Sequence, residues 1–119
     1  MADLSMFGDA GHSEQFPAGH EFFVAGDAGD LMYVVLKGEV EIVINGKVVE
    51  TVRAGGLFGE MAIIDHHERS ATARVKTPVE VATMDQKRFI AMLSVNPFFA
   101  IEVMTVMAER LRLLNQALL

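Results

Sequence analysis

The sequence predicts a mainly β domain with flanking helices, and three observations carry that prediction. Short apolar runs separated by glycine-containing turns fill residues 15–84. An Asn45-Gly46 pair lies between two such runs and is the strongest short signal of a β-hairpin. From Asp85 onward the apolar residues recur at helical spacing instead. With 119 residues, 51% of them hydrophobic, the chain suits a single domain, 1–119, with one core.

The predicted strands are short and are bounded by turn signals at spacings typical of a sandwich or barrel. We expect the strands at 22–24, 31–36, 39–44, 47–52, 70–75 and 79–84. A turn cluster at 26–30, Gly38, the Asn-Gly pair and Pro78 divide them. Before the first strand we expect partial order, with Leu4, Met6 and Phe7 forming a short helical turn.

Two helices are expected over 85–119. Asp85 is a suitable N-cap for a helix over 86–93, and Pro97 suits the first position of a second, longer helix. The inward-facing residues of the first helix are expected to be Phe89, Ile90 and Leu93. The apolar stripe of the second helix consists of Val103, Met107, Leu111, Leu114 and Leu118. Such a stripe either covers the sheet or pairs with another helix.

The composition of the chain excludes several classes of function. The formal net charge is −6, from 16 acidic and 10 basic residues, which opposes nonspecific binding to nucleic acid. The chain has no Cys, which excludes disulfides and thiolate metal sites. It has no apolar run of the ~20 residues that a membrane helix needs, and its start lacks a secretory signal. We therefore predict a cytoplasmic protein with neither nucleic acid nor membrane as partner.

The most informative stretch runs from Leu57 to Thr72. Gly59 lets the backbone approach a ligand without a Cβ in the way, and residues 60–64 suit one short, buried helical turn. Arg69 supplies a planar fork of donors that can grip a phosphate in two places, which Lys cannot do. The adjacent Ser70 adds a hydroxyl. This pattern predicts a pocket for a small, phosphate-bearing molecule.

The same residues carry a family resemblance. Phe58-Gly59-Glu60-Met61-Ala62-Ile63, followed after five residues by Arg69-Ser70-Ala71-Thr72-Ala73, resembles the phosphate-binding cassette of cyclic-nucleotide-binding domains. The spacing of Gly26, Gly29 and Gly38 also resembles the first signature of that family. The resemblance covers about residues 15–115 and is closest to the sensor domains of bacterial cAMP-responsive activators, here without their helix-turn-helix. It implies an eight-stranded jelly-roll barrel at about 15–84, a cassette helix and C-terminal helices at about 85–119.

The resemblance also implies a ligand, cAMP or cGMP, and roles for individual residues. Arg69 is implied as the partner of the cyclic phosphate and Glu60 as the partner of the ribose 2′-hydroxyl. The implied ligand-binding set is Phe58, Gly59, Glu60, Met61, Ala62, Arg69, Ser70 and Ala71. Alignment of the last helix with the bacterial activators adds base or lid contacts at Arg110, Arg112, Leu114 and Asn115.

Base choice is less defined, because Leu114-Asn115 replace the Thr-Ser pair that meets adenine in those activators. We expect cAMP and cGMP to bind within about tenfold of each other, with cAMP marginally favoured. Asn115 can bond either purine, and the hydroxyl of Ser70 can accept from the 2-amino group of guanine.

The function we favour is a regulatory sensor that binds a cyclic nucleotide and repositions its C-terminal helices. It would not be an enzyme and would need no cofactor besides its ligand. Its partner would be a second copy, through the last helix, or an unidentified effector protein. Two alternatives remain: a metal-binding, cupin-like barrel enzyme using His66 or His67, and a dimerisation or interaction domain with a vestigial pocket. Adjacent histidines in a polar loop are a poor metal site, which disfavours the first.

Overall fold

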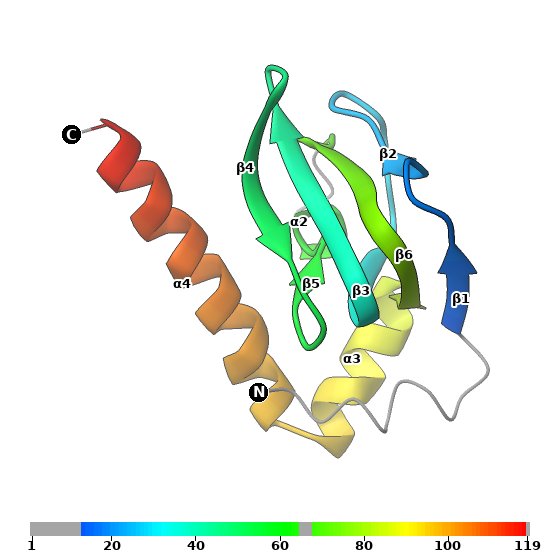
Figure 1. Ribbon diagram of the computed structural model, residues 1–119. Coiled ribbons are helices and arrows are strands. Elements are labelled where there is room, and N and C mark those ends of the chain that lie inside the picture. Colours follow the sequence, from blue (N-terminus) through cyan, green and yellow to red (C-terminus); the bar gives the residue numbers. More distant parts are fainter. Residues whose placement is uncertain (1–12, 65–67, 119) are drawn as a thin grey trace.

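The computed structural model describes residues 13–64 and 68–118, except for the side chains of residues 114, 117 and 118 (Figure 1). The described strands form one antiparallel sheet of six strands, followed by two helices. The strands are β1 (Ser13–Phe16), β2 (Glu21–Phe23), β3 (Met32–Ile44), β4 (Lys47–Val52), β5 (Leu57–Phe58) and β6 (Thr72–Met84). The helices are α2 (Met61–Ile64), α3 (Gln86–Val95) and α4 (Phe98–Leu118). The mainly β class with flanking helices is therefore confirmed.

The two long strands, β3 and β6, organise the sheet. They pair antiparallel from Met32 opposite Met84 to Val43 opposite Thr72, with register shifts on either side of Gly38. Gly38 has φ +84°, and a Cβ there would lie 2.3 Å from the carbonyl oxygen of Pro78, so only glycine fits. Each long strand joins two of the strands expected from the sequence. The described residues therefore form six strands, where the family resemblance implied eight.

The hairpin between β3 and β4 forms where the sequence predicts it. Asn45 and Gly46 both have positive φ, at 52° and 78°, as a tight type I′ turn requires. β1, by contrast, was not predicted, because its sequence Ser-Glu-Gln-Phe lacks an apolar alternation. It is ordered by pairing with the far end of β6, where Ser13 lies opposite Ala82.

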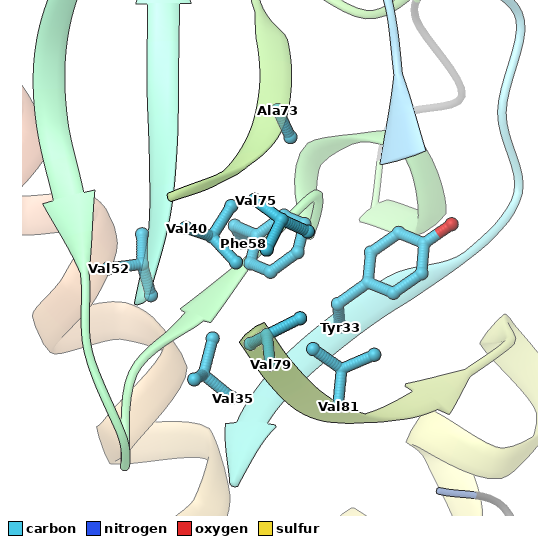
Figure 2. Packing of buried hydrophobic residues seen from close by; sticks show 9 residues of the cluster. All are labelled: Tyr33, Val35, Val40, Val52, Phe58, Ala73, Val75, Val79 and Val81. Carbon is cyan, nitrogen blue, oxygen red and sulfur yellow. The ribbon is translucent and has the colours of Figure 1, made fainter. Parts of the chain in front are cut away.

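The core consists of two clusters on opposite faces of β3. Tyr33 and Val35 point into one cluster, whereas Met32 and Val34 point into the other. Figure 2 shows the first cluster, formed by Tyr33, Val35, Val40, Val52, Phe58, Ala73, Val75, Val79 and Val81. The second contains Phe99 and Val103 of α4 and packs against Phe89 and Leu93 of α3. Burial on both faces explains why this part of β3 is a continuous apolar run.

The C-terminal helices follow the prediction in part. Asp85 caps α3, since its carboxylate accepts a hydrogen bond from the Arg88 backbone N–H at 2.8 Å. Ile90, however, is 57% exposed, because α3 packs through a narrow stripe that contains its neighbour Phe89. On α4, Val103 is buried but Leu111 is 61% exposed. Within the described residues, no helix is long and apolar enough to cross a membrane.

Candidate functional site

A cavity of about 220 Å³ is lined by β2, the β3–β4 hairpin, residues 58–62 and 68–71, and α4. All eight residues that the sequence analysis assigned to ligand binding line it: Phe58, Gly59, Glu60, Met61, Ala62, Arg69, Ser70 and Ala71. The other lining residues are Phe23, Ile42, Ile44, Val49, Glu50, Glu68, Arg110 and Leu113. The cavity thus combines two arginines and three glutamates with an apolar wall.

Arg69 is buried, with 7% of its surface exposed. Its Nη1 donates to the carbonyl oxygen of Gly59 at 2.9 Å, and its Nη2 donates to that of Leu31 at 2.7 Å. The guanidinium also lies 4.0 Å above the ring of Phe23, in cation–π contact. These contacts hold the side chain in one place against the cavity.

The charge of Arg69 is incompletely balanced by its surroundings. Within the described residues no carboxylate lies at ion-pair distance from it, and its buried Nε has no hydrogen-bond partner. Burial lowers the pKa of Arg69, and the more distant charges of Tyr33, Asp30 and Glu60 offset this only in part. Buried charges are ordinarily paired, so this arginine is suited to receive an anion.

Two glycines make room for the Arg69 side chain. A Cβ on Gly29 would lie 2.4 Å from Arg69 Nε, and a Cβ on Gly59 would lie 2.8 Å from Nη1. The backbone is also fixed, because Arg69 N–H donates to the Asp27 carbonyl and Gly26 N–H donates to the Arg69 carbonyl, both at 2.8 Å. The turn that contains Gly29 therefore forms part of the site. In the sequence, only the glycine spacing hinted at this role.

Glu60 and Arg110 join the cassette to α4. Glu60 is 2% exposed, and its carboxylate accepts a hydrogen bond from Arg110 Nη1. Arg110 also donates from Nε to Glu50 Oε1 at 2.8 Å and from Nη2 to the Leu57 carbonyl at 2.7 Å. Burial alone would lower the pKa of Arg110, but Glu50 and Glu60 outweigh it, so the pKa is raised. All three guanidinium nitrogens of Arg110 thus donate hydrogen bonds to protein acceptors.

The predicted lid residues are divided by the geometry of α4. Arg110 lines the cavity, together with Leu113 one turn further on, whereas Arg112 and Asn115 are exposed and do not line it. Residues three apart share a helix face and residues two apart do not. The side chain of Leu114 lies outside the described residues, as do His66 and His67 of the metal-site alternative. Sequence reasoning missed Leu113, Phe23 and Glu50.

A second cavity, of about 310 Å³, lies beside the first. Glu50, Arg110 and Leu113 line both cavities, whereas Leu57 and, on α4, Val106 and Glu109 line only the second. The Glu50–Arg110 ion pair therefore belongs to a shared wall.

Comparisons with known proteins agree with this geometry. Residues 13–96 match the cyclic nucleotide-binding domain family. The chain is 40% identical over 86 residues to the cAMP-dependent protein kinase regulatory subunit of Schizosaccharomyces pombe, covering 71% of this chain and 21% of that protein. It is 30% identical over 108 residues to the CRP-like cAMP-activated global transcriptional regulator of Mycobacterium tuberculosis, covering 87% and 48%.

The fold is similar to the crystal structure of the Thermus thermophilus catabolite activator protein, with a TM-score of 0.77, 29% identity, and coverage of 89% of this chain and 52% of that one. The chain thus spans about half or less of the length of these curated relatives. The family match covers well over half of the chain. The chain therefore belongs to the cyclic nucleotide-binding domain family.

Proposed function

We propose that the cavity binds a 3′,5′-cyclic nucleotide, cAMP or cGMP, and that the chain acts as a regulatory sensor. The observation that carries this proposal is Arg69, a buried cation with an unpartnered Nε beside a cavity that is apolar over much of its wall. A cyclic phosphate supplies one negative charge and acceptor oxygens for such a guanidinium. The relatives whose names specify cAMP support the same ligand class.

We assign the groups of the nucleotide to separate parts of the cavity. The cyclic phosphate meets Arg69, the Ser70 hydroxyl and nearby backbone N–H groups. The ribose 2′-hydroxyl donates to Glu60, which already accepts from Arg110. The base then occupies the apolar part, formed by Ile42, Ile44, Val49 and Leu113. We further assign the sheet to a jelly-roll barrel whose long strands bend at Gly38, which brings the β3–β4 hairpin toward the cassette.

Signalling follows from the contact between Glu60 and Arg110. A ribose hydroxyl at Glu60 changes the hydrogen bonding of the same carboxylate that holds α4. A ligand that contacts one position of α4 better than another shifts the population toward that position. The nucleotide therefore controls α4, and α4 presents the result to a partner.

For the partner we propose a second copy of the chain, meeting the first along α4; an effector protein is the alternative. Three apolar residues of α4, Ile101, Met104 and Leu111, are each more than half exposed. Apolar helix faces of this kind associate in pairs. Light scattering should show a dimer that becomes monomeric when Met104 and Leu111 are replaced by glutamate. A parent protein that is monomeric at high concentration would contradict dimerisation.

The test of nucleotide binding is a melting experiment. A ligand at a hundred times its dissociation constant adds about 2.7 kcal/mol to stability, which raises the melting temperature by roughly ten degrees in a domain of this size. We expect that shift with cAMP or cGMP and a far smaller one with 5′-AMP, whose open phosphate carries more charge and a different shape. Absence of any shift at millimolar cyclic nucleotide would contradict the proposal. Metal and nucleotide analysis of the same sample tests the cupin-like and vestigial-pocket alternatives.

A further inference from the structure

The proposed function leaves some polar side chains of the cavity without a role. Arg69 and Ser70 are assigned to the phosphate, and Glu60 to the ribose. Glu68 is exposed and directly precedes Arg69 in the chain. Arg110 is assigned to the link with α4, so Glu50, its ion-pair partner, remains without a role. Glu50 and Arg110 belong to the wall formed by β4 and α4, which also contributes Val49 and Leu113 to the apolar part assigned to the base.

Glu50 points into the cavity from β4, directly beside a β-bulge. Ile42 lies opposite Glu50, but the next residue, Val43, lies opposite Val48, so Val49 is an extra residue on β4. Successive side chains of a regular strand point to opposite faces, yet here both Val49 and Glu50 line the cavity. Bulges re-aim side chains and are common beside functional sites. The bulge thus brings Val49 into the wall beside Glu50, which places a carboxylate within an otherwise apolar region.

The carboxylate of Glu50 is held in place and can still accept. Arg110 donates to both of its oxygens, from Nε at 2.8 Å and from Nη2 at 3.3 Å. A carboxylate has about four lone-pair sites, so each oxygen keeps one acceptor position. The side chain is 27% exposed, which leaves one side accessible to a ligand. Glu50 is therefore a fixed pair of acceptors at the base end of the cavity.

We propose that Glu50 reads the base of the bound nucleotide and favours guanine over adenine. Guanine carries two adjacent donors, N1–H and the 2-amino group, which match the two oxygens of a carboxylate. Adenine offers one donor, its 6-amino group, beside the N1 lone pair, which faces the second oxygen unfavourably. A site built to hydrogen-bond a group discriminates strongly against an analogue that lacks it. This proposal rests on the proposed function and replaces the marginal preference for cAMP expected from the sequence.

The experiment is competition calorimetry with cGMP, cAMP and 3′,5′-cyclic inosine monophosphate, which keeps N1–H but lacks the 2-amino group. In the parent protein we expect cGMP to bind tightest, cyclic IMP next and cAMP weakest. A hydrogen bond to a charged group should make the affinity for cGMP about tenfold or more higher than the affinity for cAMP. In Glu50→Gln, one acceptor becomes a donor, so the ratio of the two affinities should fall about tenfold.

A matched control separates base reading from general disturbance. Glu41 of β3 is also half-buried and paired with an arginine, Arg74, but it does not line the cavity. Glu41→Gln should leave the ratio of cGMP to cAMP affinity unchanged. If Glu50→Gln also loosens Arg110, the affinities for cGMP and cAMP fall by the same factor. The ratio of the two affinities is therefore insensitive to that effect.

The outcomes distinguish this inference from the proposed function. A parent that binds none of the three nucleotides overturns both. A parent that binds them equally, or a ratio that is the same in the parent and in Glu50→Gln, overturns base reading alone. A ratio that falls equally in Glu41→Gln does the same. If Glu50→Gln does not fold, the affinities of the parent protein still test the inference. Equal affinities for cGMP and cyclic IMP would overturn the contact between Glu50 and the 2-amino group.

Discussion

The two arginines that line the cavity, Arg69 and Arg110, differ in how the protein compensates their positive charge. Arg69 is surrounded by neutral acceptors and an aromatic ring, and burial lowers its pKa. Arg110 is paired with two carboxylates and a carbonyl, and its pKa is raised. Both are charged, but only Arg110 has its charge neutralised by the protein itself. The comparison supports the proposed division, in which Arg69 is a binding group and Arg110 a cross-link.

The difference extends to the surroundings of each arginine. Arg69 depends on backbone: two glycines make room for it, and turn carbonyls accept from it. Arg110 depends on side chains from elements far apart in sequence, Glu50 of β4 and Glu60 after β5. The site of Arg69 therefore requires glycine at particular positions. The site of Arg110 instead requires acidic side chains at particular positions.

Removing Arg69 should give the largest effect. Arg69→Ala should weaken cyclic nucleotide binding by about 2–5 kcal/mol, because the phosphate is left in the cavity without its counter-charge. Glu60→Ala should cost less, about 1.5–3 kcal/mol, as expected for a hydrogen bond to a charged group. Isothermal calorimetry measures both. Arg74→Ala, which removes an arginine outside the cavity, is the control and should bind as the parent does.

Arg110→Met tests the other half of the comparison. It leaves the buried carboxylate of Glu60 without its cation, which should lower the free energy of unfolding by about 1–3 kcal/mol. Arg69→Ala, which removes an unbalanced charge, should lower it by less. Urea denaturation of the ligand-free proteins gives both values, with the exposed Arg112→Met as control, expected within about 0.5 kcal/mol of the parent. If Arg69→Ala were the less stable of the two, the division into binding group and cross-link would be wrong.

The smallest effect is expected at Gly29. A Cβ there would press on the flexible end of the Arg69 side chain rather than on backbone. Gly29→Ala should therefore fold normally but displace the guanidinium and weaken binding by about 0.5–3 kcal/mol. A double-mutant cycle makes this specific, since Gly29→Ala should cost nothing further in an Arg69→Ala background. Additive losses in the cycle would show that Gly29 acts through something other than Arg69.

Features encoded in neighbouring residues were predictable from the sequence. Asn45-Gly46 gave the hairpin and Asp85 gave the start of α3, because each signal acts within a few residues. The cassette residues were also predictable as a group, since they are close together in the chain and their order resembles a family motif. The eight of them assigned to ligand binding all line one cavity.

Features that depend on register between distant segments were not predictable. β1 pairs with β6 at Ser13 and Ala82, which no local pattern indicates. Gly29 read as an ordinary turn residue, because its contact with Arg69 spans a long stretch of chain. Glu50 was predicted only as part of a strand, and its place in the cavity depends on its pairing opposite Ile42 of β3. Leu113 of α4 also lines the cavity, and no residue of the cassette motif indicates how this helix is rotated.

The shared wall between the two cavities has an evolutionary consequence. Glu50 and Leu113, which border both cavities, are on β4 and α4, outside the cassette motif. In the proposed binding mode, substitutions there change which base is preferred, while Gly29, Gly59 and Arg69 at the proposed phosphate site stay the same. Related domains can therefore come to bind different cyclic nucleotides while their cassette motif stays the same. On this proposal the cassette motif identifies a cyclic nucleotide as the ligand, and residues of the shared wall determine which cyclic nucleotide binds.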